Sequence, residues 1–184
     1  GATECLRSDF DLLVEVSHPL VELAVPPGDE VARAIGAHAA SQVPDGATLQ
    51  TGIGSIPSGV VARLAEGSGG DYGVHSEMFT TGLMHLHQAG KVTNRKEGPY
   101  DGYSITTFAA GVPELYRWLH DNEVVRFLPV RVVNSPELIA KNRHMVTING
   151  ALAIDLSGQV VADQVRPEDY ARYCRYLVAR YGAR

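Results

Sequence analysis

The chain has 184 residues, of which 45% are hydrophobic and 20% are charged, and its formal net charge is −5 at pH 7. This composition is typical of a folded protein and argues against disorder, while the acidic balance and scattered arginines argue against a nucleic-acid partner. No apolar run reaches the roughly 18 residues of a membrane helix and no signal-peptide pattern is present, so we expect a cytoplasmic protein without a membrane partner.

The first part of the chain combines an irregular segment with a strand between two helices. Residues 1–27 contain three prolines that block regular strand pairing, and we interpret them as a lead-in arm. Apolar residues at helical spacing from Asp29 to about Val43 predict a helix. Residues 47–51 then predict a short strand, which ends in closely spaced glycines before a helix that contains Val60.

Strands and helices continue to alternate over the rest of the chain. Strands are predicted over residues 72–78, 104–110, 124–133, 145–156 and 159–162, and helices over residues 82–89, 112–120, 136–142 and 167–181. The later strands are rich in aliphatic residues with little polar alternation, as in strands that are covered on both faces. The sequence therefore predicts an α/β fold with an open, mostly parallel sheet and helices on both faces, and residues 28–184 are interpreted as a single domain.

Two turns at the predicted carboxyl edge of the sheet are candidate ligand sites, because ligands of open parallel sheets bind at that edge. The glycine turn from Gly52 to Ser55 would let backbone N–H groups approach an anion or a coenzyme chain. A turn of this kind is more often only a tight connection. In the second turn Glu77 would project at the sheet edge, but a lone glutamate is nearly always solvated surface. The residues alone leave both alternatives open.

Several ordered segments carry a more specific signal. They are Asp-Gly-Ala-Thr-Leu-Gln-Thr-Gly-Ile-Gly-Ser-Ile-Pro at 45–57, Gly-Val-His-Ser-Glu-Met-Phe at 73–79, Gly-Lys-Val-Thr-Asn at 90–94, Val-Thr-Ile-Asn-Gly-Ala-Leu at 146–152 and Asp-Leu-Ser-Gly-Gln-Val at 155–160. Together they resemble the second half of the acetyl-CoA hydrolase/transferase family, which includes acetate, succinyl and 4-hydroxybutyrate CoA-transferases. The resemblance covers about residues 8–165. It implies a CoA-transferase C-terminal-type domain of NagB/RpiA-like fold, expected to lack the family's N-terminal domain and its last segment.

The resemblance also implies a chemistry for the second turn. The carboxylate of Glu77 matches the family's glutamate, which attacks the thioester carbonyl of an acyl-CoA in a ping-pong reaction. CoA then passes to a second carboxylic acid, or water takes the acid's place and the protein is a hydrolase. CoA is a substrate in this reaction, so no cofactor and no metal are expected. The expected contacts of substrate or CoA are Gly52, Ile53, Gly54, Ser55, Asn149 and Gly150.

The expected partners are an acyl-CoA and a small carboxylate, and we expect an oligomer in which a partner chain or the family's N-terminal domain completes the cleft. Two positions depart from the family's pattern, because Thr81 stands where relatives typically carry an acidic residue and Ala153 where they usually carry Glu or Gln. For Asn149, bonding to a neighbouring loop is an equal alternative to a role in the site. The alternative function is a non-catalytic CoA-transferase-like domain for acyl-carrier binding or subunit assembly.

Histidines and cysteines of the chain are further candidates for a role in the site. His75 is expected on the same face as Glu77, and positioning is favoured over proton transfer because a carboxylate nucleophile needs no base. His85 and His87 are two residues apart on a predicted helix and would not face together, so surface histidines are favoured over a metal pair. Cys5 and Cys174 are the cysteines of the chain, and their spacing does not indicate a metal site.

Overall fold

The computed structural model describes residues 6–95 and 97–161, which belong to two compact units, Gly1–Asn149 and Gly150–Arg184. The helix predicted over residues 167–181 lies outside the described residues. Among the described helices, none is long and apolar enough to cross a membrane.

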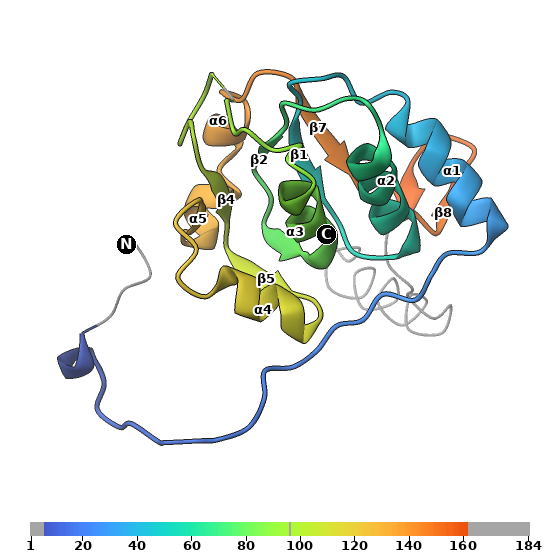
Figure 1. Cartoon of the computed structure of the whole chain (residues 1–184). Helices are drawn as coiled ribbons and strands as arrows, with labels where there is room; N and C mark the ends of the chain where they lie inside the picture. Colours follow the sequence, from blue (N-terminus) through green and yellow to red (C-terminus); the bar gives the residue numbers. More distant parts are fainter. Residues whose placement is uncertain (1–5, 96, 162–184) are drawn as a thin grey trace, which may run out of the picture. The chain divides into compact units, whose positions relative to one another are not determined.

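Parallel strands form the centre of the first unit (Figure 1). Strand β1 (Thr48–Thr51) lies between β2 (Gly73–Val74) and β7 (Met145–Ile148), and both pairings are parallel. A parallel bridge between His75 and Ile105 joins β2 to β4, which pairs with β6. The strands therefore run side by side in the order β7, β1, β2, β4, β6, with β4 at Ser104–Thr106 and β6 at Val125–Phe127.

Strands β2 and β4 are each followed by a further short strand. Strand β3 (Met78–Thr80) follows β2 after the three residues 75–77, and β5 (Phe108–Ala110) follows β4 after Thr107. The two strands pair with each other in parallel. The predicted mostly parallel sheet is thus confirmed for the first unit.

Helices cover both faces of these strands, as predicted. The helices are α1 (Glu30–Ala40), α2 (Ser55–Glu66), α3 (Thr81–Gln88), α4 (Pro113–Leu119), α5 (Val130–Val133) and α6 (Pro136–Ile139), with a short 3-10 turn, η1, at Arg7–Asp9. Neighbouring residues of a strand face opposite ways. Accordingly, Val74 packs in a cluster with Leu83 of α3 and Leu115 of α4, whereas His75 contacts Val133 at the end of α5.

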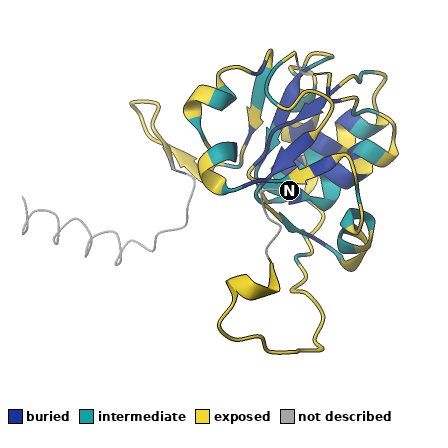
Figure 2. Ribbon diagram, turned by 90° about the vertical axis from the view of Figure 1, so that its left-hand side faces the viewer, coloured by how far each residue is buried: buried dark blue, intermediate teal, exposed yellow. Residues whose placement is uncertain are grey.

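The core lies between the strands and helices α2, α3 and α4, where the buried residues gather (Figure 2). Leu49 of β1 packs with Val61 of α2 and Leu86 of α3, and all three side chains are almost fully buried. Helices α1 and α2 approach closely at glycines, since a Cβ atom on Gly36 would lie 3.2 Å from the backbone carbonyl carbon of Gly59. Burial of this apolar surface is the main favourable term for the fold.

Helix starts follow the capping rules expected from the sequence. Asp29 Oδ1 accepts a hydrogen bond from Ala32 N–H at 2.7 Å at the start of α1. Ser135 Oγ accepts one from Leu138 N–H at 3.4 Å at the start of α6, where a serine N-cap precedes a proline at the first helical position. Helix α6 ends earlier than predicted, at Ile139.

One predicted strand is wrong in its second half. The β-branched run over residues 124–133 suggested one long strand, but β6 ends at Phe127 and Val130–Val133 form helix α5. Pro129 precedes this helix with φ −57° and has no N–H for a strand ladder. The proline therefore overrides the strand propensity of the valines that follow it.

Other predicted strands are shorter than expected. The strands over residues 72–78 and 104–110 are interrupted at residues 75–77 and at Thr107, and the strand over 145–156 ends at Ile148. In the second unit, β8 (Ala153–Ile154) pairs antiparallel with β9 (Val160–Val161). The single domain predicted for residues 28–184 stays a prediction.

The turn of the second unit is built around Asp155. Its Oδ1 accepts hydrogen bonds from Ser157 N–H at 2.8 Å, Ser157 Oγ–H at 2.6 Å and Gln159 N–H at 2.8 Å. The side-chain bond from Ser157 and the backbone bond from Gln159 hold the pKa of Asp155 below its usual value. Gly158 has φ +88°, which explains a glycine in this turn.

Candidate active site

The two turns selected from the sequence lie at the same edge of the sheet. The carboxyl ends of parallel strands meet there, and they place Gly52 after β1, Glu77 after β2, Thr107 after β4 and Asn149 after β7. Gly52 N–H donates to the carbonyl of Ile148 at 2.7 Å, which joins the ends of β1 and β7 directly. The expected location at the sheet edge is therefore found for both turns.

Ser76 fixes the turn that carries Glu77. Its side chain is 1% exposed, and its Oγ lies 3.3 Å from the backbone nitrogen of Thr51 and 2.9 Å from the carbonyl oxygen of Met78. The hydroxyl accepts from the first group and donates to the second. Ser76 thus links the end of β1 to the start of β3 and holds the turn between them.

The backbone of Glu77 is fixed from the neighbouring strand. Its carbonyl accepts hydrogen bonds from Thr107 N–H at 2.8 Å, Phe108 N–H at 3.2 Å and Thr106 Oγ–H at 2.9 Å. These donors are the last residue of β4, the first residue of β5 and the residue between them, so the interruption of one strand matches the interruption of the other. A backbone held by several hydrogen bonds gives the side chain a defined origin.

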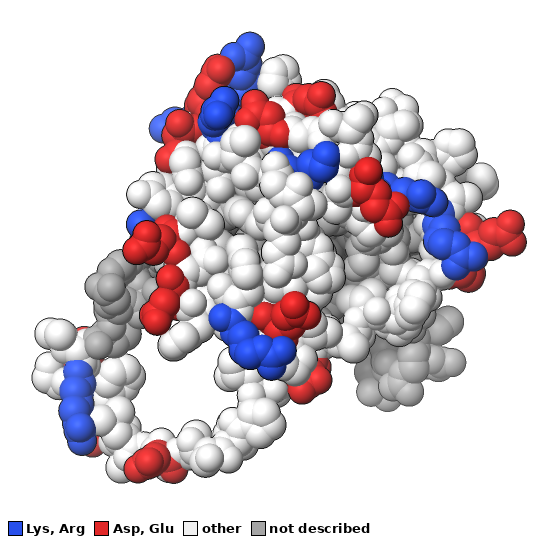
Figure 3. Space-filling view, viewed as in Figure 1, with Lys and Arg blue, Asp and Glu red and all other residues white. Residues whose placement is uncertain are grey.

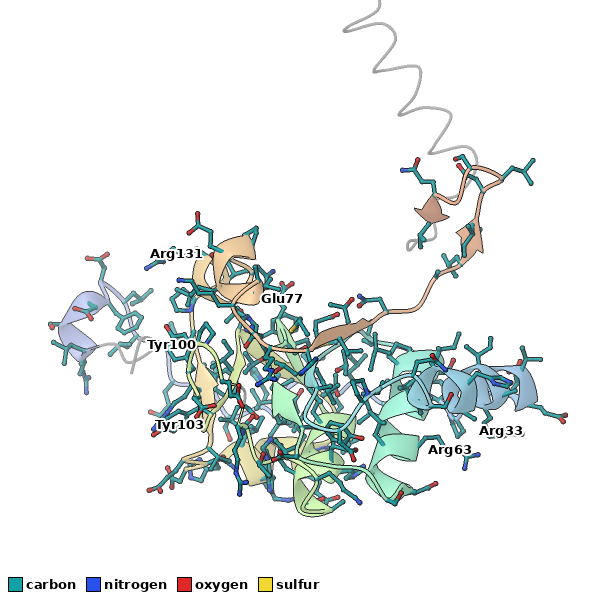
Figure 4. The ribbon with its side chains drawn as sticks, turned by 90° about the horizontal axis from the view of Figure 1, so that it is seen from above. Arg33, Arg63, Glu77, Tyr100, Tyr103 and Arg131 are labelled. Atoms are coloured by element: carbon teal, nitrogen blue, oxygen red, sulfur yellow. The ribbon has the colours of Figure 1, made fainter. Side chains whose placement is uncertain are left out.

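The side chain of Glu77 is exposed and is directed toward the α5 end (Figure 4). Its Oε2 accepts a hydrogen bond from Asn134 Nδ2 at 2.8 Å. Asn134 is the C-cap residue of α5. Sequence reasoning missed Asn134, which lies 57 residues from Glu77 in a segment predicted to follow a strand. No local pattern could have identified it.

His75 also contacts the end of α5, but from the interior. Its ring is 2% exposed, with Nε2 2.7 Å from the Val133 carbonyl oxygen and Nδ1 2.7 Å from Asn142 Nδ2. The two-residue spacing from Glu77 is expected to put both side chains on one face, and both of them reach the same helix end. One of them is buried and the other exposed, because the chain turns at Ser76.

The glycine turn has the geometry expected of a strand-to-helix connection. Gly54 has φ +122°, a conformation that favours glycine, and α2 begins at Ser55. The first N–H groups of an α-helix have no acceptor within the helix, so Ser55 and Ile56 lie where an anionic group could be bound. The Gly52 N–H, in contrast, is occupied by Ile148.

Asn149 lies beside Gly52, but its amide is engaged. Its Nδ2 donates to Gln50 Oε1 and its Oδ1 accepts from Gln50 Nε2, both at 3.1 Å. A Cβ atom on Gly52 would lie 2.6 Å from Asn149 Oδ1, so a larger residue there would displace the Asn149 side chain from this pair. Gly150, also expected to contact substrate, is the first residue of the second unit.

A cavity of about 240 Å³ lies next to the glycine turn. Its lining includes Gly52 and Ile53, Met78 of β3 and the arm residues Leu23–Val25, whereas Glu77 does not line it. A second cavity, of about 590 Å³, lies between the arm, α1 and residues Ile53–Ile56. Ile53 therefore borders both cavities. The arm is held here by the hydrogen bond from Leu23 N–H to the Gly111 carbonyl at 2.9 Å.

The two histidines of α3 differ from each other. His85 is exposed, as predicted, whereas His87 is half-buried with Nε2 2.9 Å from Ser104 Oγ, which corrects the prediction of a surface residue. Its ring also contacts Phe79 and Trp118, with centroids 5.9 and 5.3 Å away. Burial lowers the pKa of His87 from 6.5 to about 4.

Charges around the site do not form a metal centre. Among the described residues, no group of three or more histidine, cysteine, aspartate or glutamate side chains is placed to hold a metal ion. Acidic and basic side chains are interspersed over the face drawn in Figure 3.

Comparison with known proteins places these features in context. The family model of the acetyl-CoA hydrolase/transferase C-terminal domain matches residues 111–172. The chain is 42% identical over 158 residues to a 4-hydroxybutyrate coenzyme A transferase of Clostridium kluyveri, which covers 86% of this chain and 36% of that protein. It is 38% identical over 167 residues to a succinyl-CoA:acetate/propanoyl-CoA:succinate CoA transferase of Fasciola hepatica, and this match covers 90% of this chain and 34% of that protein.

Solved structures give the same likeness. RipA from Yersinia pestis matches with a TM-score of 0.81 and 37% identity, over 86% of this chain and 36% of that one. A 4-hydroxybutyrate CoA-transferase from Porphyromonas gingivalis matches with a TM-score of 0.77 and 37% identity, over 83% and 38%. The chain thus spans about a third of the length of the relatives it matches.

Proposed function

Because the chain belongs to the acetyl-CoA hydrolase/transferase family, we propose that it takes part in transfer of coenzyme A between an acyl-CoA and a carboxylic acid, with Glu77 as the nucleophile. The observation that carries the proposal is an exposed carboxylate on a fixed backbone at the carboxyl edge of a parallel sheet. Ligands of open parallel sheets bind at this edge.

The proposed reaction proceeds through two covalent intermediates. The Glu77 carboxylate attacks the thioester carbonyl carbon, the C–S bond breaks, and a mixed anhydride and CoA thiolate result. The thiolate then attacks the glutamyl carbonyl, which releases the first carboxylate and leaves a glutamyl-CoA thioester. An incoming carboxylate reverses both steps and leaves as the new acyl-CoA. Attack by water on the anhydride or the glutamyl thioester would make the protein a hydrolase.

Asn134 is proposed as a hydrogen-bond donor to the glutamyl group. The 2.8 Å bond from its Nδ2 to Glu77 Oε2 supports this role, because the same amide can follow that oxygen as it becomes a carbonyl oxygen and an oxyanion. In other enzymes, removal of one such donor costs about 2.7 to 4 kcal/mol of transition-state stabilisation. Asn149, bonded to Gln50, would need to change partner to act in the same way.

The substrate contacts are proposed at the glycine turn, with no cofactor beyond the CoA thioester itself. The N-terminus of α2 at Ser55 suits a negatively charged or polar group, and Ile53 offers an apolar contact on the border of two cavities. Since a cavity of about 150 Å³ can hold benzene in another protein, the cavity beside Ile53, at about 240 Å³, has room for a short acyl chain.

The test is intact-mass spectrometry of the protein after incubation with an acyl-CoA, followed by hydroxylamine, which cleaves anhydrides and thioesters. We expect a CoA or acyl adduct that hydroxylamine removes and that is absent in Glu77→Gln. Glu114→Gln is the matched control, because Glu114 is an exposed glutamate of the first turn of α4. It should form the adduct as the wild type does.

The assay should be repeated with candidate partner chains, since the chain spans about a third of its relatives. An adduct that persists in Glu77→Gln would refute Glu77 as the nucleophile. No adduct under any of these conditions would favour the alternative of a non-catalytic domain for acyl-carrier binding or assembly.

A further inference from the structure

We propose that His75 is a positioning residue for the acyl exchange. Its ring holds the carbonyl group of Val133 and thereby keeps the adjacent Asn134 amide against the Glu77 carboxylate. The proposal rests on the proposed function of Glu77, but its structural part concerns a set of hydrogen bonds that can be tested separately.

The protonation of the His75 ring follows from its neighbours. Asn142 Nδ2 lies near the carbonyl oxygens of Leu138 and Ile139, at 3.3 and 3.1 Å, and near His75 Nδ1 at 2.7 Å. Carbonyl oxygens only accept hydrogen bonds, so the amide nitrogen must face this group and Nδ1 of His75 is an acceptor. The proton of the neutral ring is then on Nε2, which donates to the Val133 carbonyl at 2.7 Å.

The end of α5 depends on contacts of this kind. The helix has four residues, Val130–Val133, and so short a helix is not stable by itself. Val133 is 1% exposed and packs with Ile105 and Leu128, which fixes its side chain. The bond from His75 fixes its carbonyl group. Asn134 is the next residue, so its side-chain amide is positioned by the packing of Val133 and by the hydrogen bond from His75.

His75 and Glu77 belong to one turn, and both bond to neighbouring residues of α5 and its cap. The buried side chain binds the Val133 carbonyl, and the exposed one accepts from the Asn134 amide. Ser76 between them is tied to β1 and β3. Together these hydrogen bonds limit how the Glu77 carboxylate and the Asn134 amide move relative to each other. Misplacement of a reacting group by about 1 Å can cost about 100-fold in rate.

Proton transfer by His75 does not fit this arrangement. Both ring nitrogens form short hydrogen bonds inside the protein, to Val133 and to Asn142, and the ring is 2% exposed. A general base must reach the proton that it removes. His75 therefore acts through Asn134 and does not contact the reacting atoms.

Two substitutions separate the two ring contacts. In His75→Gln, the side-chain amide can place an N–H where Nε2 stands and keep the Val133 contact. In His75→Asn, the shorter side chain can reach Asn142 but not the Val133 carbonyl. We expect His75→Asn to slow formation of the Glu77 adduct about 10- to 100-fold at saturating acyl-CoA, with little change in the half-saturating concentration. We expect His75→Gln to stay within a few-fold of the wild type.

A double-mutant cycle distinguishes positioning from a general loss of structure. If His75 acts through Asn134, His75→Asn should add little to the effect of Asn134→Ala, whereas independent effects would add. Equal rates of His75→Asn and the wild type, or additive effects in the cycle, would overturn the proposal.

A second readout does not depend on activity. The side-chain amide signals of Asn134 in a ¹H–¹⁵N NMR spectrum should move in His75→Asn and stay in place in His75→Gln. If the wild type forms no Glu77 adduct, the proposed function fails, and these signals still decide whether His75 holds Asn134. Signals that stay in place in His75→Asn would refute the contact. Should His75→Asn not fold, the ¹⁵N chemical shifts of the wild-type His75 ring decide the question: a protonated Nε2 and an unprotonated Nδ1 are expected, and the opposite tautomer would refute the proposal.

Discussion

The half-buried ring of His87 predicts a pH-dependent loss of stability. Burial lowers its pKa from 6.5 to about 4, because the charged form would lose its hydration among Phe79 and Trp118. Between these two pKa values the unfolded chain binds a proton at this residue that the folded chain does not. The free energy of unfolding must therefore fall as the pH falls through this range, while the contribution is fully present above the unfolded-state value.

The size of the effect follows from the same shift. The full difference corresponds to at most about 3 kcal/mol, and partial exposure of the ring reduces it, so we expect about 1 to 2 kcal/mol between about pH 7 and about pH 5. Urea unfolding followed by fluorescence measures it, since Trp118, the chain's single tryptophan, lies beside the ring. His87→Gln keeps an N–H for Ser104 Oγ and removes the titration.

The expected result is a free energy of unfolding that falls less steeply toward low pH in His87→Gln than in the wild type. His85→Gln is the control, because His85 is exposed on the same helix and should leave the slope as it is. If His87→Gln and the wild type lose stability in parallel, burial of this ring does not govern its protonation and the reasoning is refuted.

Two further substitutions test contacts near the site and the core. Gly52→Ala places a Cβ atom 2.6 Å from Asn149 Oδ1 and should lower the free energy of unfolding by about 1 to 3 kcal/mol in urea titrations. Gly59→Ala is the control and should not lower it, because a Cβ atom there meets open space. Equal losses of stability in the two variants would contradict the argument. Burial and the nearby Asp45 raise the pKa of Tyr72, so in an absorbance titration one phenol should ionise after the others. Tyr72→Phe should remove that late step, and its persistence would show that another tyrosine is responsible.

Local sequence patterns determined most of the elements of the first unit. The glycines after Thr51 mark the end of β1 and the start of α2, and the serine before Pro136 marks the start of α6, because turn and cap preferences act within a few residues. The ordered motifs also selected Glu77 and the glycine turn, whose places at the sheet edge follow from strand direction. Prediction of these elements requires only the periodicity of apolar residues and the preferences of turn residues, and both can be read from a single sequence.

Tertiary structure decided what lies beside those residues. The valines after Pro129 favour a strand by themselves, yet they form α5, and only this helix brings Asn134 to Glu77 across 57 residues. In the same way, His87 is half-buried because Trp118 and Ser104 fold against it. Contacts between distant residues depend on how the whole chain packs, and spacing along a sequence does not encode them. The sequence by itself therefore gives the nucleophile proposed here, while its amide partner and the histidine behind that partner come from the fold.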